Sequence, residues 1–279
     1  MVMQKIRAAV AVASSLSPTL TLAIGNGVSV SGSIRTGLEA TDPGWQIIDN
    51  DSRIRFQASS HIGSNQKAFV NYQLRVNSAM GSIAPKDDRH LSYVGITGDW
   101  GSFSVGTQWS TAFNTVGTFI DKSFRYGGTS LDCVQYRMRH SVLLITQLGD
   151  LKLMGDLQMA PGDDSLDRAT VGGLLSNGRV SIAGMYQSAA EDCLGVAAAV
   201  RLGDVELSGG FVEREGGASG WDINGSIGKF WIDLSASDLA GEAFVATYTL
   251  NLAGETDLVF EGTNTDGGTR ASVFLRYDF

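Results

Sequence analysis

Two sets of charged residues in this sequence have the types and spacing to act together. The arginine set is Arg35, Arg53, Arg55, Arg75, Arg137, Arg139 and Arg276. The acidic set is Asp156, Glu206, Asp222, Asp233, Asp257 and Glu261. Both sets fall on the polar side of segments whose apolar and polar residues alternate, and only two lysines and Arg201 interrupt the acidic set. Opposed walls of opposite charge create a field across a water-filled space, which orients polar solutes without binding them tightly.

The longest connection between the alternating segments, residues 110–133, carries two further acids, Asp121 and Asp132. Crowded arginines repel one another unless water or nearby acids relieve them. Asp121 and Asp132 are the expected partners, and we expect Asp121 to face the arginines of the second and third segments across the narrowest point. Replacing Asp121 with Asn should then shift ion selectivity toward anions.

Histidine spacing gives no support for catalysis or metal binding. His61, His90 and His140 lie in different segments, and no serine or cysteine nucleophile stands at a recognisable spacing from them. No group of histidines and cysteines has the spacing of a metal site. We therefore expect no enzyme activity, no resident metal and no cofactor.

The two cysteines, Cys133 and Cys193, fall in different connections on the same side of the expected fold. An exported protein reaches an oxidising compartment, where a disulfide between them can form. Sequence does not determine whether their Cα atoms come within about 4.4–6.8 Å of each other. A disulfide and two free thiols therefore both stay open.

Strands must position these residues, because the alternation has a period of two over most of the chain. We expect about sixteen strands. They cover residues 27–39, 51–62, 67–77, 89–98, 101–109, 134–147, 150–159, 166–175, 179–188, 194–203, 204–213, 219–227, 229–236, 242–252, 255–263 and 269–279. Every second connection is very short and rich in Gly, Asn and Asp, and the others are mostly longer. Short turns at one end and longer loops at the other are typical of an outer-membrane barrel.

The placement of the apolar face separates a barrel from a soluble sandwich. A sandwich hides its apolar faces between two sheets. In lipid the apolar face points outward, the polar face lines the interior, and the sheet must close because unpaired edge amides are costly. The number of strands favours an all-β, transmembrane antiparallel barrel with residues 110–133 folded into its interior.

Composition and charge narrow the partners and the compartment. The chain has 279 residues and a formal net charge of −8, which disfavours nucleic acid as a partner. Residues 1–23 have the features of a secretory signal peptide, since Lys5 and Arg7 precede an apolar run that ends in small residues. Residues 24–279 then form the barrel, and no run of about 18 apolar residues predicts a membrane-spanning helix.

Three blocks of sequence carry a family resemblance: residues 51–74, residues 89–108, and the terminal strand that ends in Tyr277 and Phe279. They resemble the Gram-negative general porins. The resemblance implies a sixteen-stranded barrel in the outer membrane of a Gram-negative cell, in contact with lipid, usually a homotrimer, with its third loop folded inward. It also implies passive diffusion of ions and small hydrophilic solutes.

One step of the sequence departs from that family. Gly106-Thr107-Gln108 replaces the common Gly-Arg-Gln step, so one arginine is missing from the expected constriction. Two other interpretations stay open. A plugged outer-membrane barrel would act as a binding or adhesion protein, and a soluble exported β-sandwich would bind carbohydrate. Short outer loops and a single long third loop favour the open channel.

Overall fold

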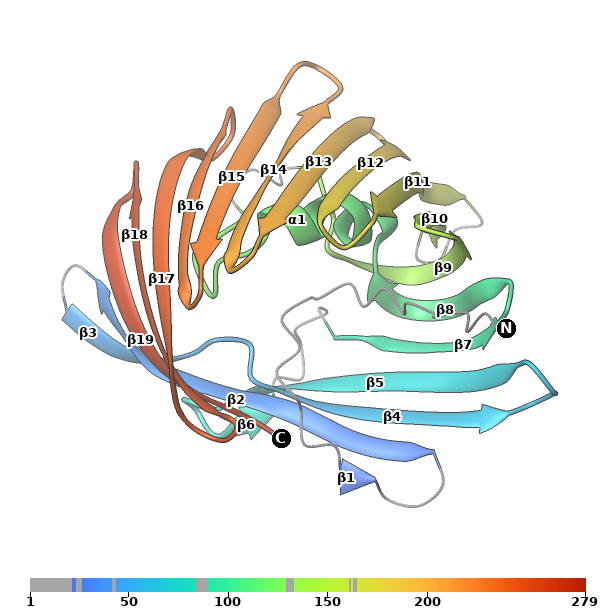
Figure 1. The fold of residues 1–279 in the computed structure, drawn as a ribbon, viewed down its shortest axis with the longest axis horizontal. Helices are drawn as coiled ribbons and strands as arrows, with labels where there is room; N and C mark the ends of the chain where they lie inside the picture. The colour runs from blue at the N-terminus through green and yellow to red at the C-terminus, as the bar shows by residue number, and fades with distance from the viewer. Residues whose placement is uncertain are drawn as a thin grey trace, which may run out of the picture.

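The computed structural model describes residues 22–23, 27–41, 44–83, 90–128, 133–160, 162 and 165–279. The expected signal peptide, residues 1–23, lies outside the described residues apart from Leu22 and Ala23, and Asp132 also lies outside them. Figure 1 shows the strands side by side in chain order, following the curve of a ring. No helix in the described part of the chain is long and apolar enough to cross a membrane.

Nineteen strands and two short helical turns make up the described fold. The strands are β1 (Leu22–Ala23), β2 (Val28–Thr41), β3 (Gly44–Asp49), β4 (Arg53–His61), β5 (Lys67–Asn77), β6 (Ser82–Ile83), β7 (Ser92–Gly98), β8 (Gly101–Trp109), β9 (Arg137–Leu148), β10 (Leu151–Met159), β11 (Leu166–Ser176), β12 (Val180–Ser188), β13 (Cys193–Leu202), β14 (Val205–Arg214), β15 (Ser219–Ile227), β16 (Phe230–Ser237), β17 (Gly241–Ala253), β18 (Thr256–Thr265) and β19 (Gly268–Asp278). The helical turns are the π-helix η1 (Phe113–Gly117) and the α-helix α1 (Thr118–Ile120).

Antiparallel pairing of successive strands forms a ring, which the pairing of β19 with β2 closes. β1, β3 and β6 are short additions; β3 and β4 both pair with β2 and form one barrel strand interrupted at residues 50–52. Sixteen strands therefore make the closed barrel, which confirms the prediction. The last residue takes part in closure, since Gly32 N–H donates to Phe279 O at 2.7 Å and Phe279 N–H donates to Gly32 O at 3.1 Å.

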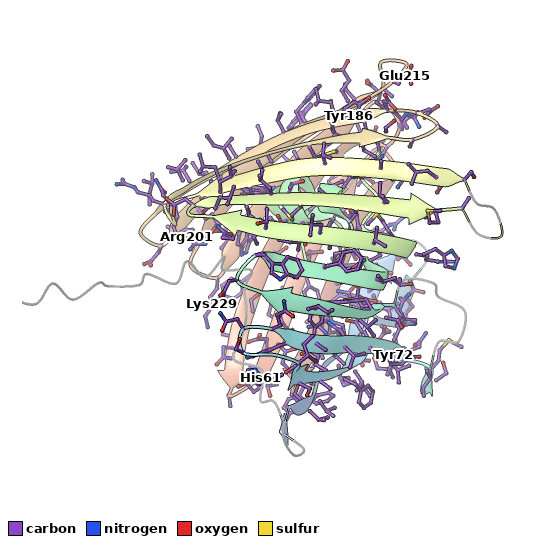
Figure 2. The ribbon with its side chains drawn as sticks, turned by 90° about the vertical axis from the view of Figure 1, so that its right-hand side faces the viewer. His61, Tyr72, Tyr186, Arg201, Glu215 and Lys229 are labelled. Atoms are coloured by element: carbon purple, nitrogen blue, oxygen red, sulfur yellow. A yellow bond between two sulfur atoms is a disulfide. The ribbon has the colours of Figure 1, made fainter. Side chains whose placement is uncertain are left out.

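Side-chain alternation gives the barrel an apolar outer face. On β5, Val70 and Tyr72 are 39% and 47% exposed, whereas their neighbours Asn71 and Gln73 are 6% and 2% exposed. Figure 2 shows Tyr72 and Tyr186 on the outer surface. A closed ring with exposed apolar residues outside and polar residues inside is the pattern of a barrel in lipid, because lipid contacts the apolar residues and every backbone group is paired.

Two-residue turns join the strands at one end of the barrel. Leu148 pairs with Leu151, and Leu202 pairs with Val205, which leaves Gly149 and Gly203 at the first central position of their turns. Their φ angles are 61° and 64°, a region that glycine enters without strain. Lys229 occupies the same kind of turn, and Figure 2 shows it at the rim opposite Glu215.

The buried face of β10–β14 departs from the expected polar pattern, because apolar residues line it. Met154, Leu174, Met185 and Val212 are at most 6% exposed. They form one hydrophobic cluster with the apolar residues of η1 and α1. The core of the molecule therefore lies between these strands and the connection from β8 to β9.

Candidate functional site

The connection that leaves β8, residues 110–128, is called the loop segment below. Its base is tied to the residues that lead into β9, since Ser110 N–H donates to Tyr136 O at 2.9 Å and the Ser110 hydroxyl donates to Gln135 O. Thr111 N–H donates to a carboxylate oxygen of Asp156 on β10 at 2.5 Å. These bonds direct the first helical turn of the loop segment along β10.

The apolar side of the loop segment packs on β10–β14. Ala112, Val116 and Ile120 are fully buried in that contact. Glycines on the strands make the space: a Cβ at Gly210 would lie 2.9 Å from Ile120 Cγ2, and one at Gly195 would lie 3.2 Å from Val116 Cγ2. Because apolar burial contributes about 25 cal/mol per Å², this contact fixes the first part of the loop segment against β10–β14.

Glu261 on β18 holds the far part of the loop segment. Its carboxylate accepts the backbone N–H groups of Phe124, Arg125 and Tyr126 at 2.7, 2.7 and 2.8 Å. The Thr247 hydroxyl donates to the same carboxylate at 2.6 Å. Glu261 is 3% exposed, and hydrogen bonds to an ionised acceptor are stronger than neutral ones. Three consecutive N–H groups thus converge on one buried carboxylate.

Glu39 on β2 forms a second anchor beside the first. Arg125 Nε donates to it at 2.8 Å, the Tyr126 hydroxyl at 2.8 Å, and Gln46 Nε2 at 2.7 Å. Burial raises the pKa of the Tyr126 hydroxyl, and the hydrogen bond to Glu39 adds to that rise. The loop segment therefore extends from β8 to the strands that close the barrel.

Asp121 follows α1 and lies beside Tyr136 and Arg137. Burial raises the pKa of the Asp121 carboxyl to about 6, although the hydrogen bond from Tyr136 and the charges of Arg137 and Lys122 oppose the rise. The charge of Glu261 adds to it. Asp121 is thus an acid of the loop segment whose ionisation changes near neutral pH.

Most of the predicted acidic set contacts the loop segment. Four of its members do so: Asp156, Glu206, Asp233 and Glu261. Lys122 Nζ lies 3.5 Å from Glu206, and the Ser123 hydroxyl donates to Asp233 at 3.3 Å. These acids hold a loop in place, and they are not spread along an open wall as the simple alternation suggests.

Five residues of the predicted arginine set come together on neighbouring strands, and they are called the arginine cluster below: Arg35, Arg53, Arg55, Arg75 and Arg276. Arg35 is the direct cross-strand partner of Arg276, and Arg53 is that of Arg75. Like charges directly opposite each other destabilise a sheet, so this arrangement needs counter-charges or water.

Asp51 supplies the counter-charge that the structure places within the arginine cluster. Its carboxylate lies 3.1 Å from Arg53 and 3.5 Å from Arg75. Arg276 pairs instead with Asp278. Among the described residues Arg35 and Arg55 form no ion pair; Arg35 donates to Ser33, and Arg55 donates to Gln73 at 3.1 Å.

A β-bulge separates Arg137 and Arg139. Arg137 lies 3.7 Å from Asp51 and stacks on Trp109 with 4.2 Å between its Cζ and the ring centroid, so it extends the arginine cluster. Register shifts between Gly106 and Gln108, which sets two residues, Arg139 and His140, opposite Thr107. Arg139 is therefore on the exposed face, and not on the interior face where uninterrupted alternation put it.

A disulfide joins Cys133, which precedes β9, to Cys193 at the start of β13, with their Cα atoms 6.0 Å apart. Gln187 Nε2 also donates to Cys133 O at 3.2 Å. Of the two states that sequence left open, the structure has the bonded one. No group of three or more His, Cys, Asp or Glu in the described residues is placed to hold a metal ion.

Residues 6–279 match the sequence profile of a family described as Gram-negative porin. The chain belongs to the Gram-negative porin family. No curated protein matches the porin. The family and the closed sixteen-stranded barrel are those of outer-membrane channels, so this porin is an outer-membrane channel protein.

Solved porin structures share the fold at low sequence identity. A triple mutant of the Rhodopseudomonas blastica porin superposes with a TM-score of 0.73 at 16% identity, covering 90% of this chain and 100% of that one. An anion-selective porin from Comamonas acidovorans gives 0.71 at 14%, covering 90% and 99%. A loop L8 deletion mutant of OmpT, an outer-membrane protein of Vibrio cholerae, gives 0.72 at 14%, also covering 90% and 99%.

Sequence reasoning missed three kinds of residue in the porin. Asp51 lies in the interruption between β3 and β4, whereas the sequence predicted it as the first residue of a strand at 51–62 and did not include it among the interior charges. Glu39 lies on the polar side of its expected strand, but nothing in the sequence indicated that Arg125 and Tyr126 of the loop segment would bind it. Gly195 and Gly210 carried a usable signal, because glycine and alanine gather on both faces of β13 and β14, which predicts a close contact on the interior side.

Proposed function

We propose that this porin is an open, water-filled channel for passive diffusion of ions and small hydrophilic solutes, with the loop segment acting as an infolded constriction. The observation that carries this proposal is the difference between the two sides of the barrel: one side binds the loop segment, and the other carries arginines that stay partly exposed. The loop segment is bound to β10–β18 and β2 by apolar contacts and by buried acids. The Arg53, Arg75 and Arg276 side chains keep 25%, 25% and 20% of their surface exposed.

The charge balance supports a preference for anions. Arg35 and Arg55 have no ion-pair partner among the described residues, whereas most of the interior acids are bound to the loop segment. Solutes that pass the arginine cluster therefore meet excess positive charge, which raises the local concentration of anions. The structural neighbour from Comamonas acidovorans is named as anion-selective, which agrees with the same preference here.

Lining roles follow from this proposal. Arg35, Arg53, Arg55, Arg75, Arg137 and Arg276 would line the positive side of the constriction. Asp121 would face these arginines from the loop segment, and Asp132 would add a second negative charge on the same side. Glu206 and Asp233 would act at its edge, through Lys122 and Ser123.

Export and assembly belong to the same proposal. Residues 1–23 would act as a signal peptide and direct the chain to the outer membrane of a Gram-negative cell. The exposed apolar outer face would contact lipid, and part of it would form the interface of a homotrimer.

Planar-bilayer recording of the detergent-purified protein tests this function. We expect stepwise conductance in groups of three and a reversal potential of anion-selective sign in a potassium chloride gradient. Folded, heat-modifiable protein that gives no conductance would contradict an open channel, and would favour a plugged barrel that binds or adheres. A cation-selective reversal potential would contradict only the anion preference.

A further inference from the structure

We propose that Asp51 sets the charge selectivity of this channel, by occupying the position in the arginine cluster that the anionic group of a solute would otherwise take. The inference rests on the proposed function. It places the controlling acid on the barrel wall itself, at the break between β3 and β4, and not on the loop segment.

The contacts of Asp51 reach three different strands. Its carboxylate lies 3.1 Å from Arg53 on β4, 3.5 Å from Arg75 on β5, and 3.7 Å from Arg137 at the start of β9. Guanidinium groups bind carboxylates and phosphates through the same planar fork of donors. Asp51 therefore presents to three arginines the same chemical group that an anionic solute would present.

The backbone around Asp51 is built to hold it there. Asp51 has φ 61°, a left-handed conformation that Asp and Asn tolerate better than other side chains. Its neighbour Ser52 is fully buried and accepts Arg35 N–H at 2.7 Å. On the other side, Asn50 N–H donates to Arg35 O at 2.9 Å. Backbone strain of this kind persists where the surrounding structure imposes it, and it gathers at functional sites.

Other acids near the arginine cluster are less available. The Asp49 carboxylate accepts from Ser52 N–H at 3.2 Å and from the Ser78 hydroxyl at 2.6 Å. The Asp278 side chain is 7% exposed and pairs with Arg276, whereas the Asp51 side chain is 35% exposed. Asp51 thus combines contact with the arginines and contact with water, so its charge acts on ions that pass.

Four variants test the proposal in planar bilayers with a potassium chloride gradient. Asp51→Asn removes the charge and keeps a residue suited to the left-handed conformation, and Asp51→Gly does the same by a different route. Asp204→Asn removes one acid from a short turn at the barrel rim as the matched control. Arg75→Gln removes positive charge from the same site. Heat modifiability on gels reports folding of each variant.

We expect Asp51→Asn and Asp51→Gly to raise the permeability ratio of chloride to potassium by about threefold, as removal of one nearby charge predicts. Asp204→Asn should leave that ratio near the wild-type value, and Arg75→Gln should lower it. An unchanged ratio in the folded Asp51 variants, or a rise in Asp204→Asn as large as theirs, would overturn the proposal. If the Asp51 variants do not fold, an unchanged ratio in Arg75→Gln overturns it instead. Wild-type protein without conductance would contradict the channel function itself.

Discussion

Along β10–β18, apolar residues, glycines and buried acids bind the loop segment, whereas along β2–β5 arginines keep part of their surface in contact with water. The first region is held by apolar burial and by hydrogen bonds to the buried carboxylate of Glu261. The second crowds like charges, which the protein's own Asp51 and Asp278 relieve in part. Comparing the two shows how one barrel supplies a rigid support on one side and a charged, wet surface on the other.

Removal of the anchor at Glu261 should have the largest effect on the support of the loop segment. Glu261→Gln replaces an ionised acceptor of three backbone N–H groups with a neutral amide, in a site that is 3% exposed. We expect the free energy of unfolding to fall by roughly 4 kcal/mol. Urea titration in lipid vesicles, followed by tryptophan fluorescence, measures this change.

Asp257→Asn is the matched control for that anchor on the same strand. Asn251 Nδ2 donates to the Asp257 carboxylate at 3.0 Å in an exposed position. Replacement of Asp257 should therefore change the free energy of unfolding by about 0.5 kcal/mol or less. Equal losses in the two variants would show that Glu261 has no special anchoring role.

The disulfide gives the next largest effect. It joins Cys133 and Cys193 across a sequence separation of 60 residues, and closing a loop of that kind restricts the unfolded chain. Replacing both cysteines with Ser should lower the free energy of unfolding by about 3 kcal/mol. Wild-type protein unfolded in the presence of a dithiol reductant should match the double variant. Two different values would mean that the serines disturb the fold by some other route.

Glycine packing beneath the loop segment should make a smaller contribution to its support. Gly210→Ala brings a Cβ to 2.9 Å from Ile120 Cγ2, so the loop segment must shift, at a cost of about 2 kcal/mol. Gly184→Ala is the matched control, since its Cβ would meet nothing nearer than 3.7 Å. The same unfolding titration applies, and a larger loss in Gly184→Ala than in Gly210→Ala would contradict the packing argument.

The smallest expected effect is the pH dependence that Asp121 gives to selectivity. With a pKa of about 6, its carboxyl is mostly ionised at pH 7 and mostly protonated at pH 5. Selectivity should therefore move toward anions as the pH falls from 7 to 5, by about twofold in the permeability ratio. The raised pKa also means that ionisation opposes folding above pH 6, and that this cost disappears as the pH falls below about 4.

Asp121→Asn isolates that contribution from the groups around it, which include Lys122, Tyr136, Arg137 and Glu261. The variant should be more anion-selective than wild type at pH 7 and should lose the Asp121 part of the pH dependence. An unchanged reversal potential at pH 7 would remove Asp121 from the ion pathway.

Strand prediction succeeded because a two-residue period is a local property. The segment expected at residues 166–175 appears as β11 (Leu166–Ser176), and the two-residue turn at Gly149 is where the glycine indicated. The error at Arg139 has the opposite cause. A bulge adds one residue to a strand and changes the face on which the residues at that point lie, and it shows only in the shift of register between Gly106 and Gln108 of the partner strand.

Site prediction went as far as the type and face of each residue. Arg53 and Arg75 were expected in one cluster because the strands that carry them are sequential neighbours. Their partner Asp51 was not named, because the irregular break that holds it between β3 and β4 was expected to be regular strand. The acid that was expected to face the arginines, Asp121, lies beside Tyr136 and Arg137, and its place at the narrowest point stays a prediction. Contacts across a barrel depend on the path of a loop, and a loop has no repeating pattern of apolar and polar residues from which that path could be predicted.

The sequence was sufficient to predict that this chain closes into an outer-membrane barrel. Alternation, short glycine turns and a C-terminal aromatic strand are all local signals, which depend only on residues close together in the chain. Tertiary structure alone decided which interior charges meet. Glu261 holds backbone groups more than 130 positions away in the chain, as the separations of 137, 136 and 135 residues for its three bonds show. The physical reason is that side-chain alternation specifies a face, whereas electrostatic pairing depends on distances that only the closed barrel and its bound loop establish.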